Sequence, residues 1–347
     1  MVALAAELCR PSLQREGEDM YDIVALGEAM LRFTPPDHQR LEQATSFQVN
    51  VSGSELNTSW GTARLGLCTT WVSRLVDNPM GRMIAGKARE MGVDVSHVQW
   101  TPKGRVGLYY CEMGASTRAS RVYYDRKGSA MSQMKPGTVD WAAILEGAKV
   151  FHVSGITPAL SADCRLVTEE AIRAAKQAGC LVSFDMNYRS RLWSPLEARD
   201  CVEALLDRVD ILLTTSDDTS IVFGVEGEPA DIAGKFVDKY GLKVAVLTIR
   251  EAPSVLRGKW SSVAVTDDGQ TYASRAKIDL ELIDRVGSGD AYDAGFLYGL
   301  LSGDVPKAVR YGDAMSAIKH SVPGDHAWIT SEEVETHVEG LRTKIVR

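Results

Sequence analysis

The chain has 347 residues, of which 45% are hydrophobic and 24% charged, with 46 acidic and 39 basic side chains and a formal net charge of −7. This composition is typical of a globular protein of one or two domains, and the acidic balance argues against a broad nucleic-acid or membrane-binding surface. No apolar run approaches the roughly 20 residues that span a bilayer.

The six cysteines include no C-x-x-C pair, and the six histidines show no metal-ligand spacing. We therefore expect reduced thiols in a cytoplasmic protein and no zinc site. Residues 1–20 begin with a short apolar patch that Glu7 interrupts, and an acidic run follows. We expect this segment to be a disordered extension rather than a signal peptide.

The first part of the chain alternates strands and helices, but extended segments interrupt the series. Apolar runs predict strands over 23–26 and 69–72, with helices over 55–65 and 81–91. Extended pieces at 30–34 and 47–51, and a hairpin of 106–113 with 121–124, do not fit this alternation. We expect these pieces to combine into one small separate sheet.

From about residue 150 the alternation is regular. The predicted strands are 150–153, 181–184, 211–213 and 244–248, followed by a β pair at 262–266 and 270–276; the predicted helices are 163–178, 195–206, a helical stretch ending at Tyr240, 288–301, 305–320 and a last helix from Ser331. Buried apolar strands between helices predict an α/β fold with a doubly wound, mostly parallel sheet flanked by helices.

A glycine loop that enters the predicted helix at 288 has the pattern of an anion site. Gly287, Ser288 and Gly289 would leave backbone N–H groups free at a helix N-terminus, where the helix dipole favours negative charge. Asp290 follows directly, and it would repel a phosphate unless it faces the other reactant and takes a proton from an attacking hydroxyl. The alternative is that Asp290 only complements the helix dipole, worth roughly 0.3–1 kcal/mol.

Polar clusters follow several predicted strands, and ligands bind at the carboxyl ends of the strands in open α/β sheets. Arg189 could clamp a carboxylate, or form a local pair with Asp185. Arg126 and Tyr124 end the hairpin and suit a sugar acid, or form an exposed hairpin tip. The chain contains no P-loop motif, and no G-x-G-x-x-G follows the first strand.

Over about residues 21–338 the chain resembles the ribokinase-like (PfkB-type) carbohydrate kinases. Residues 284–290 are similar to the signature D-T-x-G-A-G-D of that family, with Arg285 and Ser288 in place of Thr and Ala. The resemblance implies that Gly287, Ser288 and Gly289 form the anion hole, that Asp290 is the catalytic base, and that ATP and Mg²⁺ are the cofactors. The N-terminal signature is similar to residues 52–57, where Ser52 replaces a glycine.

Within that family the chain is most similar to 2-keto-3-deoxygluconate kinases, in pieces at 107–109, 124–130, 153–160, 187–189, 192–195 and 323–325. The similarity assigns the sugar acid to Gly53, Asn57, Tyr109, Tyr124, Arg126, Arg189 and Asp325. It assigns the nucleotide to Ser216, Thr248, Arg250, Gly287, Gly289 and Asp313. No residue is assigned as a metal ligand.

These features predict one kinase domain over 21–347, with a lid formed from about 30–51 and 106–124. An isolated lid sheet would leave an apolar face bare, so we predict at least a dimer through the lid. The expected reaction is ATP-dependent phosphorylation of a sugar acid, with 2-keto-3-deoxygluconate converted to its 6-phosphate as the leading candidate. The alternatives are 2-keto-3-deoxygalactonate, a neutral sugar such as fructose or ribose, or a non-catalytic sensor of a sugar acid or nucleotide.

Overall fold

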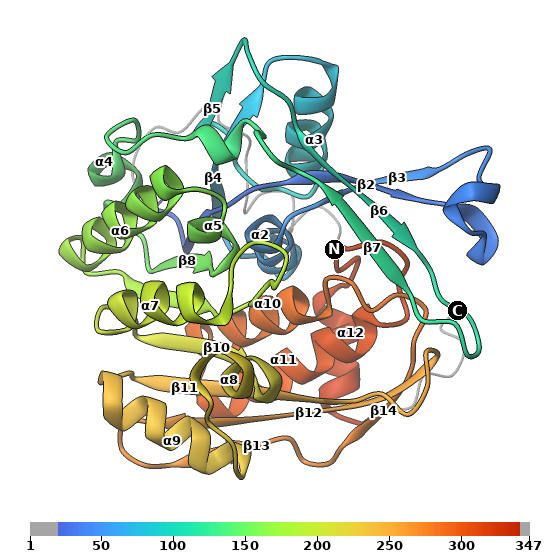
Figure 1. Cartoon of the computed structure of the whole chain (residues 1–347). Coiled ribbons are helices and arrows are strands. Elements are labelled where there is room, and N and C mark those ends of the chain that lie inside the picture. The colour runs from blue at the N-terminus through green and yellow to red at the C-terminus, as the bar shows by residue number, and fades with distance from the viewer. Residues whose placement is uncertain (1–19, 341–347) are drawn as a thin grey trace.

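A ten-stranded sheet forms the centre of the part of the chain that the computed structural model describes, residues 20–340 (Figure 1). The predicted N-terminal extension lies outside these residues, apart from Met20. The strands of the sheet are β1 (Ile23–Leu26), β4 (Thr69–Val76), β5 (Val98–Thr101), β8 (Val150–Ser154), β9 (Leu181–Asp185), β10 (Ile211–Thr215), β11 (Val244–Glu251), β12 (Arg257–Thr266), β13 (Thr271–Ala273) and β14 (Ile278–Glu281).

The order of the strands is β13-β12-β11-β10-β9-β8-β1-β4-β5, with β14 also paired to β12. Pairing is parallel from β11 to β5 and antiparallel at β12, β13 and β14. The carboxyl ends of the parallel strands therefore meet at one edge of the sheet, where ligands bind in open α/β folds.

Helices cover both faces of the sheet, which confirms the predicted doubly wound architecture. One face packs against α4 (Trp141–Leu145), α6 (Ala162–Gln177), α7 (Pro195–Leu206) and α9 (Pro229–Tyr240). The other face packs against α2 (Ser54–Arg64), α3 (Pro79–Glu90), α10 (Ser288–Leu301) and α11 (Val305–Lys319). The remaining helices are α5 (Ile156–Ala159), α8 (Ser216–Phe223) and α12 (Ser331–Val338).

Helix starts follow local sequence rules. The side chain of Ser161 accepts a hydrogen bond from the N–H of Cys164 and so caps α6. Ser194 and Glu197 form a capping box at the start of α7, with Pro195 in the first helical position. These side chains satisfy N–H groups that have no partner inside the helix, which explains why the predicted boundaries of these helices are close to the observed ones.

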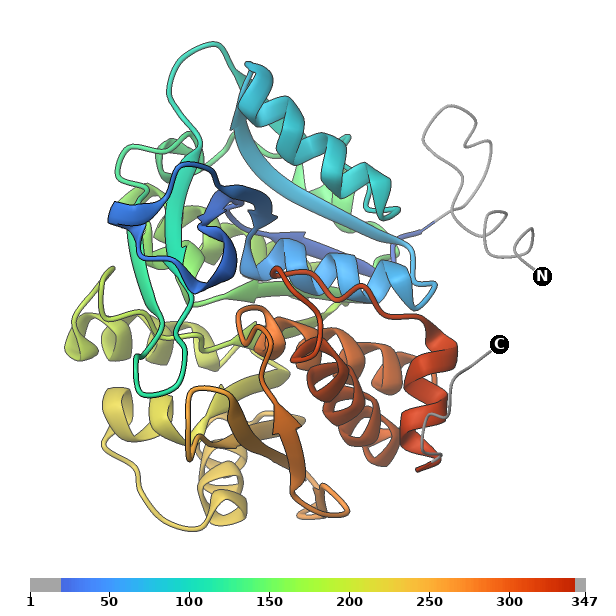
Figure 2. The same ribbon diagram turned by 90° about the vertical axis from the view of Figure 1, so that its right-hand side faces the viewer.

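A separate four-stranded sheet stands beside the main sheet and faces the viewer in Figure 2. Within residues 20–340 its strand order is β3 (Gln48–Ser52), β2 (Met30–Thr34), β6 (Gly107–Glu112) and β7 (Arg121–Asp125). The predicted small sheet is thus confirmed, and we call it the lid sheet. Arg32 pairs with Asn50 and Tyr109, and Tyr109 with Tyr124, so these four side chains share one face.

Some short elements were not predicted. Strands β5 and β14 and helices α4 and α5 have only four or five residues each, too few for a hydrophobic period to show. Cys111, Cys164, Cys180 and Cys201 are free thiols and are buried. No helix within residues 20–340 is long and apolar enough to cross a membrane.

Candidate active site

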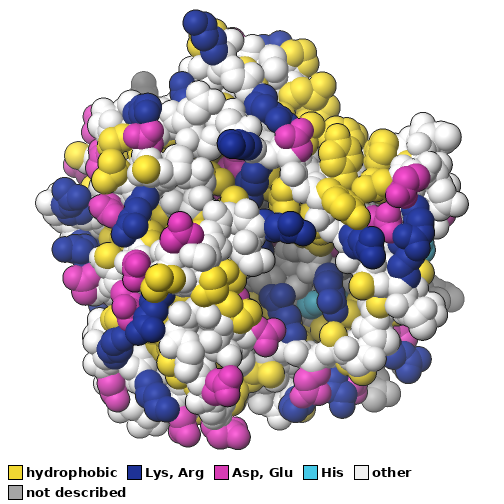
Figure 3. Space-filling model, in the orientation of Figure 1, with side chains coloured by type: hydrophobic (Ala, Val, Ile, Leu, Met, Phe, Trp, Pro, Cys, Tyr) yellow, Lys and Arg dark blue, Asp and Glu magenta, His cyan; other side chains and the backbone are white. Residues whose placement is uncertain are grey.

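A cavity of about 480 Å³ opens between the carboxyl ends of the parallel strands and the lid sheet. Figure 3 shows a hollow in this face with Lys and Arg side chains at its edge. Most of the predicted site residues line the cavity together, although they come from segments far apart in the sequence: Gly53, Asn57, Tyr109, Tyr124, Arg126, Arg189, Ser216, Thr248, Arg250, Gly287, Gly289 and Asp290. Ser288, Asp313 and Asp325 do not line it.

Asp290 lies in the first turn of α10 and is held by donors from α2. Its Oδ1 accepts a hydrogen bond of 2.9 Å from Ser54 Oγ, and its Oδ2 one of 2.6 Å from Asn57 Nδ2. Burial raises the pKa of Asp290, and the bonds from Asn57 and Ser54 act in the opposite direction. A fixed, partly desolvated carboxylate with a raised pKa is suited to accept a proton near neutral pH.

Gly287 needs to be glycine for two separate reasons. Its φ of 81° lies in the left-handed region, and a Cβ there would lie 1.9 Å from the carbonyl oxygen of Asp325. Gly287 is also the N-cap of α10, so the N–H groups of the first helical turn follow it without partners inside the helix. The buried Ser288 Oγ has no hydrogen-bond partner among the described residues. A helix N-terminus with such N–H groups is the kind of place where anions bind in proteins, as the sequence predicts for this loop.

Further carboxylates lie beside Asp290 at the strand ends. Burial and the charges of Asp290 and Asp218 raise the pKa of Asp185 to about 7. Burial and the neighbouring charges of Asp185 and Asp290 hold the pKa of Asp293 well above its usual range. Like charges in one desolvated site cannot all ionise readily. The cluster therefore holds protons near neutral pH unless a cation joins it.

A metal ion would need ligands that the protein does not supply alone. Among residues 20–340, no three His, Cys, Asp or Glu side chains form a group able to hold an ion. Mg²⁺ in phosphoryl-transfer sites is bound by one or two carboxylates together with phosphate oxygens and water. The carboxylates that line the cavity, and the Asp293 Oδ2 atom, which has no hydrogen-bond partner among the described residues, fit this way of binding Mg²⁺.

The two arginines predicted to clamp a carboxylate differ in their surroundings. Arg126 is ion-paired to Glu28, with Nε donating to Oε2 at 2.8 Å. Arg189 lies in the same cavity, and its Nη1 donates to the carbonyl oxygen of Tyr188 at 3.1 Å. Within the described chain no carboxylate lies within 4 Å of the Arg189 guanidinium, so the alternative of a close ion pair with Asp185 is not found. The charge of Arg189 still opposes the rise in the pKa of Asp185 and of Asp218.

Asp325 stands behind the cavity wall rather than in it. Its Oδ1 accepts hydrogen bonds from Tyr109 Oη at 2.5 Å and from Ser52 Oγ at 3.1 Å, and its Oδ2 is 3.2 Å from Arg32 Nη1. Asp325 is 1% exposed. Asp325 thus holds Tyr109 and Ser52, both of which line the cavity, and its direct contact with the substrate stays a prediction.

Asp313, predicted to lie near the nucleotide, is buried and does not line the cavity, and its place in the nucleotide site stays a prediction. It accepts hydrogen bonds from Trp260 Nε1 at 3.0 Å, Ser262 Oγ at 2.8 Å and Ser274 Oγ at 2.6 Å. These bonds tie α11 to β12 and to the segment after β13, away from the cavity lining. The residue was hard to place from sequence, because its three donors all come from another part of the chain.

Several lining residues were missed by the sequence assignments, and some of them left a signal. Glu28 lies two residues after the end of β1, and Asp293 lies one helical turn after Asp290. Asn187 has a φ of 38°, an unusual value outside glycine, and its Nδ2 donates to Ser54 Oγ and Asp185 Oδ2, each at 2.8 Å. Strand ends and helix spacing could have identified these positions.

The described residues thus combine a glycine loop at a helix N-terminus with the buried carboxylate of Asp290. A model of the pfkB family of carbohydrate kinases matches residues 20–330. The chain belongs to this family. It is an enzyme of the carbohydrate kinase type, as its glycine loop predicts.

Named relatives are similar over almost their whole length. The 2-dehydro-3-deoxygalactonokinase of Haloferax volcanii is 35% identical, over 92% of this chain and 97% of its own. The 2-dehydro-3-deoxygluconokinase of Thermoproteus tenax is 31% identical, over 93% and 96%. The crystal structure of the 2-dehydro-3-deoxygluconokinase of Thermotoga maritima is 37% identical, covers 92% of this chain and 99% of its own, and superimposes with a TM-score of 0.88.

Proposed function

We propose that this protein transfers the γ-phosphoryl group of ATP to a hydroxyl of a 2-keto-3-deoxy sugar acid, the gluconate or its galactonate epimer. The names of the relatives above support the substrate class (2-dehydro and 2-keto are synonyms). The observation that carries the proposal is the presence in one cavity of the glycine loop, the Asp290 carboxylate, and Arg189, whose guanidinium forms no ion pair within 4 Å among the described residues.

In this mechanism Asp290 takes the proton of the attacking hydroxyl as the oxygen approaches phosphorus. Ser54 and Asn57 hold the carboxylate so that its proton-accepting oxygens keep one position. The N–H groups of the loop that begins at Gly287 receive the charge of the transferred group. The catalysis is positioning and electrostatic stabilisation, as is general for phosphoryl transfer.

The nucleotide would occupy the part of the cavity lined by Ser216, Thr248 and Arg250, next to the anion loop. Arg250 stacks over the ring of Trp260 at 5.0 Å, and this contact holds its guanidinium near Gly289. The carboxylates of Asp185, Asp218 and Asp293, which line the cavity, would hold Mg²⁺. When bound, it supplies positive charge that neutralises the transferring group.

The substrate carboxylate would pair with Arg189 in this proposal. Arg126 is already neutralised by Glu28, so it serves better as a hydrogen-bond donor to a hydroxyl or keto oxygen. Gly53 lines the same part of the cavity, and this position requires glycine because a Cβ there would lie 2.3 Å from the carbonyl oxygen of Glu28. Tyr109 and Tyr124, whose ring centroids are 5.6 Å apart, form an apolar wall for the carbon chain.

The lid sheet supports the proposal of a homo-oligomer. Phe33, Phe47 and Tyr110 form an aromatic cluster with centroids 5.6 to 6.1 Å apart, and Val49 and Tyr123 beside it are 45% and 47% exposed. The strand register places Phe33, Val49, Tyr110 and Tyr123 on the lid face turned away from the cavity. A second lid could cover this face.

The test is ADP release from MgATP with 2-keto-3-deoxygluconate, 2-keto-3-deoxygalactonate, fructose and ribose side by side. Turnover confined to keto-deoxy acids supports both the kinase reaction and the role of Arg189. Turnover of a neutral sugar alone rejects the sugar-acid substrate and keeps the role of Asp290. Binding of a sugar acid with no turnover would favour the sensor alternative.

A further inference from the structure

Lys319, in the last turn of α11, is a buried cation that the proposed mechanism does not yet use. Its residue exposure is 0%. Its Nζ donates to the backbone carbonyl oxygens of Asp284 and Val322, both at 3.1 Å. Among residues 20–340 no carboxylate oxygen lies within 4 Å of Nζ. A buried lysine whose close partners are two carbonyl oxygens is uncommon, because burial of an ammonium group costs several kcal/mol.

The two carbonyl groups belong to the two loops that build the anion site. Asp284 begins the segment that leads to Gly287 and Asp290, and Val322 belongs to the turn that leads to Asp325. These loops approach each other again at Gly287, where an added Cβ would lie 1.9 Å from the Asp325 carbonyl oxygen. Lys319 therefore joins, through one atom, the two backbone segments that set the shape of the anion hole.

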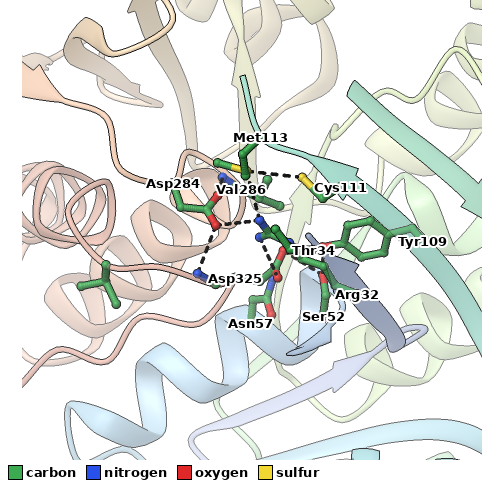
Figure 4. A network of polar contacts seen from close by, with 12 residues as sticks. Arg32, Thr34, Ser52, Asn57, Tyr109, Cys111, Met113, Asp284, Val286 and Asp325 are labelled. Carbon is green, nitrogen blue, oxygen red and sulfur yellow. Dashed lines mark hydrogen bonds and ion pairs between the residues drawn. The ribbon is translucent and has the colours of Figure 1, made fainter. Parts of the chain in front are cut away.

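The charges around Lys319 explain why a cation is tolerated there. Arg32 Nη2 is 2.8 Å from Asp284 Oδ2, and Arg32 Nη1 is 3.2 Å from Asp325 Oδ2, as Figure 4 shows. Two cations thus accompany two carboxylates in one buried cluster. Burial lowers the pKa of Lys319, and the Asp284 and Asp325 carboxylates act in the opposite direction.

Other contacts also join the two loops. Gly324 N–H donates to Asp284 Oδ2 at 3.0 Å, and the carbonyl of His320 accepts from Ile283 N–H at 2.9 Å. Lys319 adds a positive charge to these backbone contacts. It attracts the oxygen ends of two peptide dipoles, as a monovalent cation does when carbonyl oxygens replace its hydration shell.

We propose that Lys319 is a positioning residue for phosphoryl transfer, a built-in cation that holds the anion loop in the place where a monovalent metal ion could otherwise bind. This inference rests on the proposed kinase function. It predicts that the wild-type enzyme needs no added potassium. It also predicts that removal of the ammonium group creates a potassium requirement. The carbonyl oxygens of Asp284 and Val322 would then face the space that the ammonium group has left, and they could bind a potassium ion there.

The first arm of the test measures wild-type turnover in KCl and in tetramethylammonium chloride at equal ionic strength. ADP should be separated by chromatography and ATP supplied as a potassium-free salt, so that potassium acts on this enzyme alone. Equal rates in the two salts are expected. Activation of the wild type by potassium of about tenfold or more would overturn the proposal, and this arm needs no variant to fold.

The second arm compares Lys319→Met with Lys235→Met, which removes an exposed lysine from α9. We expect Lys319→Met to lose about 10²-fold in kcat, the scale of a small displacement of catalytic groups, and to recover part of it in KCl but not in tetramethylammonium chloride. Lys235→Met should match the wild type in both salts. Unchanged activity of Lys319→Met, or a loss with no response to potassium, would overturn the proposal.

A third measurement separates this proposal from the proposed function. If the wild type phosphorylates none of the sugars, the melting temperatures still decide the role of Lys319. Potassium that binds the vacated site stabilises the folded variant by mass action, so Lys319→Met should melt at a higher temperature in KCl than in tetramethylammonium chloride. The wild type should show no such difference. Equal melting of Lys319→Met in the two salts would reject the built-in cation.

Discussion

Replacement of Asp290 by Asn tests the proposed base most directly. Asn has nearly the same shape, and its carbonyl oxygen can still accept a hydrogen bond from Ser54 or Asn57. What is lost is the ability to accept the hydroxyl proton. Because the site is buried at 8% exposure, bulk water cannot easily replace the missing base.

The expected loss follows from the size of general-base effects. Such a group contributes about 10²- to 10⁴-fold in rate, about 2.7 to 5.5 kcal/mol of transition-state stabilisation. We therefore expect kcat of Asp290→Asn to fall at least about 10²-fold, with the affinity for the sugar acid little changed. If Asp290 only complements the helix dipole, the variant should lose stability by roughly 0.3–1 kcal/mol and keep its turnover.

The pH dependence of activity provides a second test of the role of Asp290. Burial raises the pKa of Asp290 above the ordinary carboxyl value, so kcat/KM of the wild type should fall in acid at a pH above about 3.9. The hydrogen bond from Ser54 acts to lower this pKa. Ser54→Ala should therefore move the acid limb of the profile to higher pH.

The assay is steady-state ADP release across a range of pH, with Asp267→Asn as the control because Asp267 lies in the β12–β13 turn, away from the cavity lining. The control should follow the wild-type profile. Turnover of Asp290→Asn within a few-fold of the wild type would refute the assignment of the base. An acid limb of Ser54→Ala that stays in place or moves to lower pH would refute the electrostatic account.

Three further predictions concern the cavity, and a fourth concerns the lid. Arg189→Ala should raise KM for a sugar acid by about 10- to 100-fold, the value of a hydrogen bond to a charged group, and leave any neutral-sugar turnover unchanged. An equal effect on sugar acids and neutral sugars would exclude the binding of the substrate carboxylate by Arg189. Arg126→Ala should lower the melting temperature because it leaves Glu28 buried and unpaired, and adding Glu28→Gln should restore part of the loss; no restoration would contradict the pairing. Burial raises the pKa of Asp185 to about 7, so this carboxyl keeps its proton in the folded protein up to a higher pH than in the unfolded chain, which loses it near pH 4. The free energy of unfolding should therefore decline as the pH rises from about 4 to about 7. In denaturant unfolding, Asp185→Asn should show a smaller decline over this range than the wild type. Light scattering should show a dimer or larger, and Tyr123→Lys should weaken it; a monomeric wild type at micromolar concentration would reject the lid interface.

The sequence was enough to predict the long elements and the glycine loop. Helices such as α6 and α7 have an amphipathic period and their own capping residues, so local rules determine where they begin. The parallel sheet followed from buried apolar strands between helices. The anion loop and Asp290 are contiguous in sequence, so the chemistry they suggest could be inferred without knowledge of their neighbours.

Only the tertiary structure decided which charges are paired. Arg126 and Glu28 are 98 residues apart, and Asp325 reaches Arg32 across 293 residues. A guanidinium that looks free in the sequence can therefore form an ion pair in the fold, as Arg126 does with Glu28, while Arg189 forms none within 4 Å in the described part of the chain. The same holds for Asp313, whose donors come from β12 and the segment after β13.

The physical reason is that a buried charge is stable only when its partners are present, and the strand order of the sheets determines those partners. A local sequence pattern specifies backbone conformation and the spacing of side chains on one element. It does not specify which segments meet at the carboxyl edge of the sheet. The pairing of Glu28 with Arg126, the hydrogen bonds of Asp325 and the carbonyl contacts of Lys319 all depend on which segments the fold brings together.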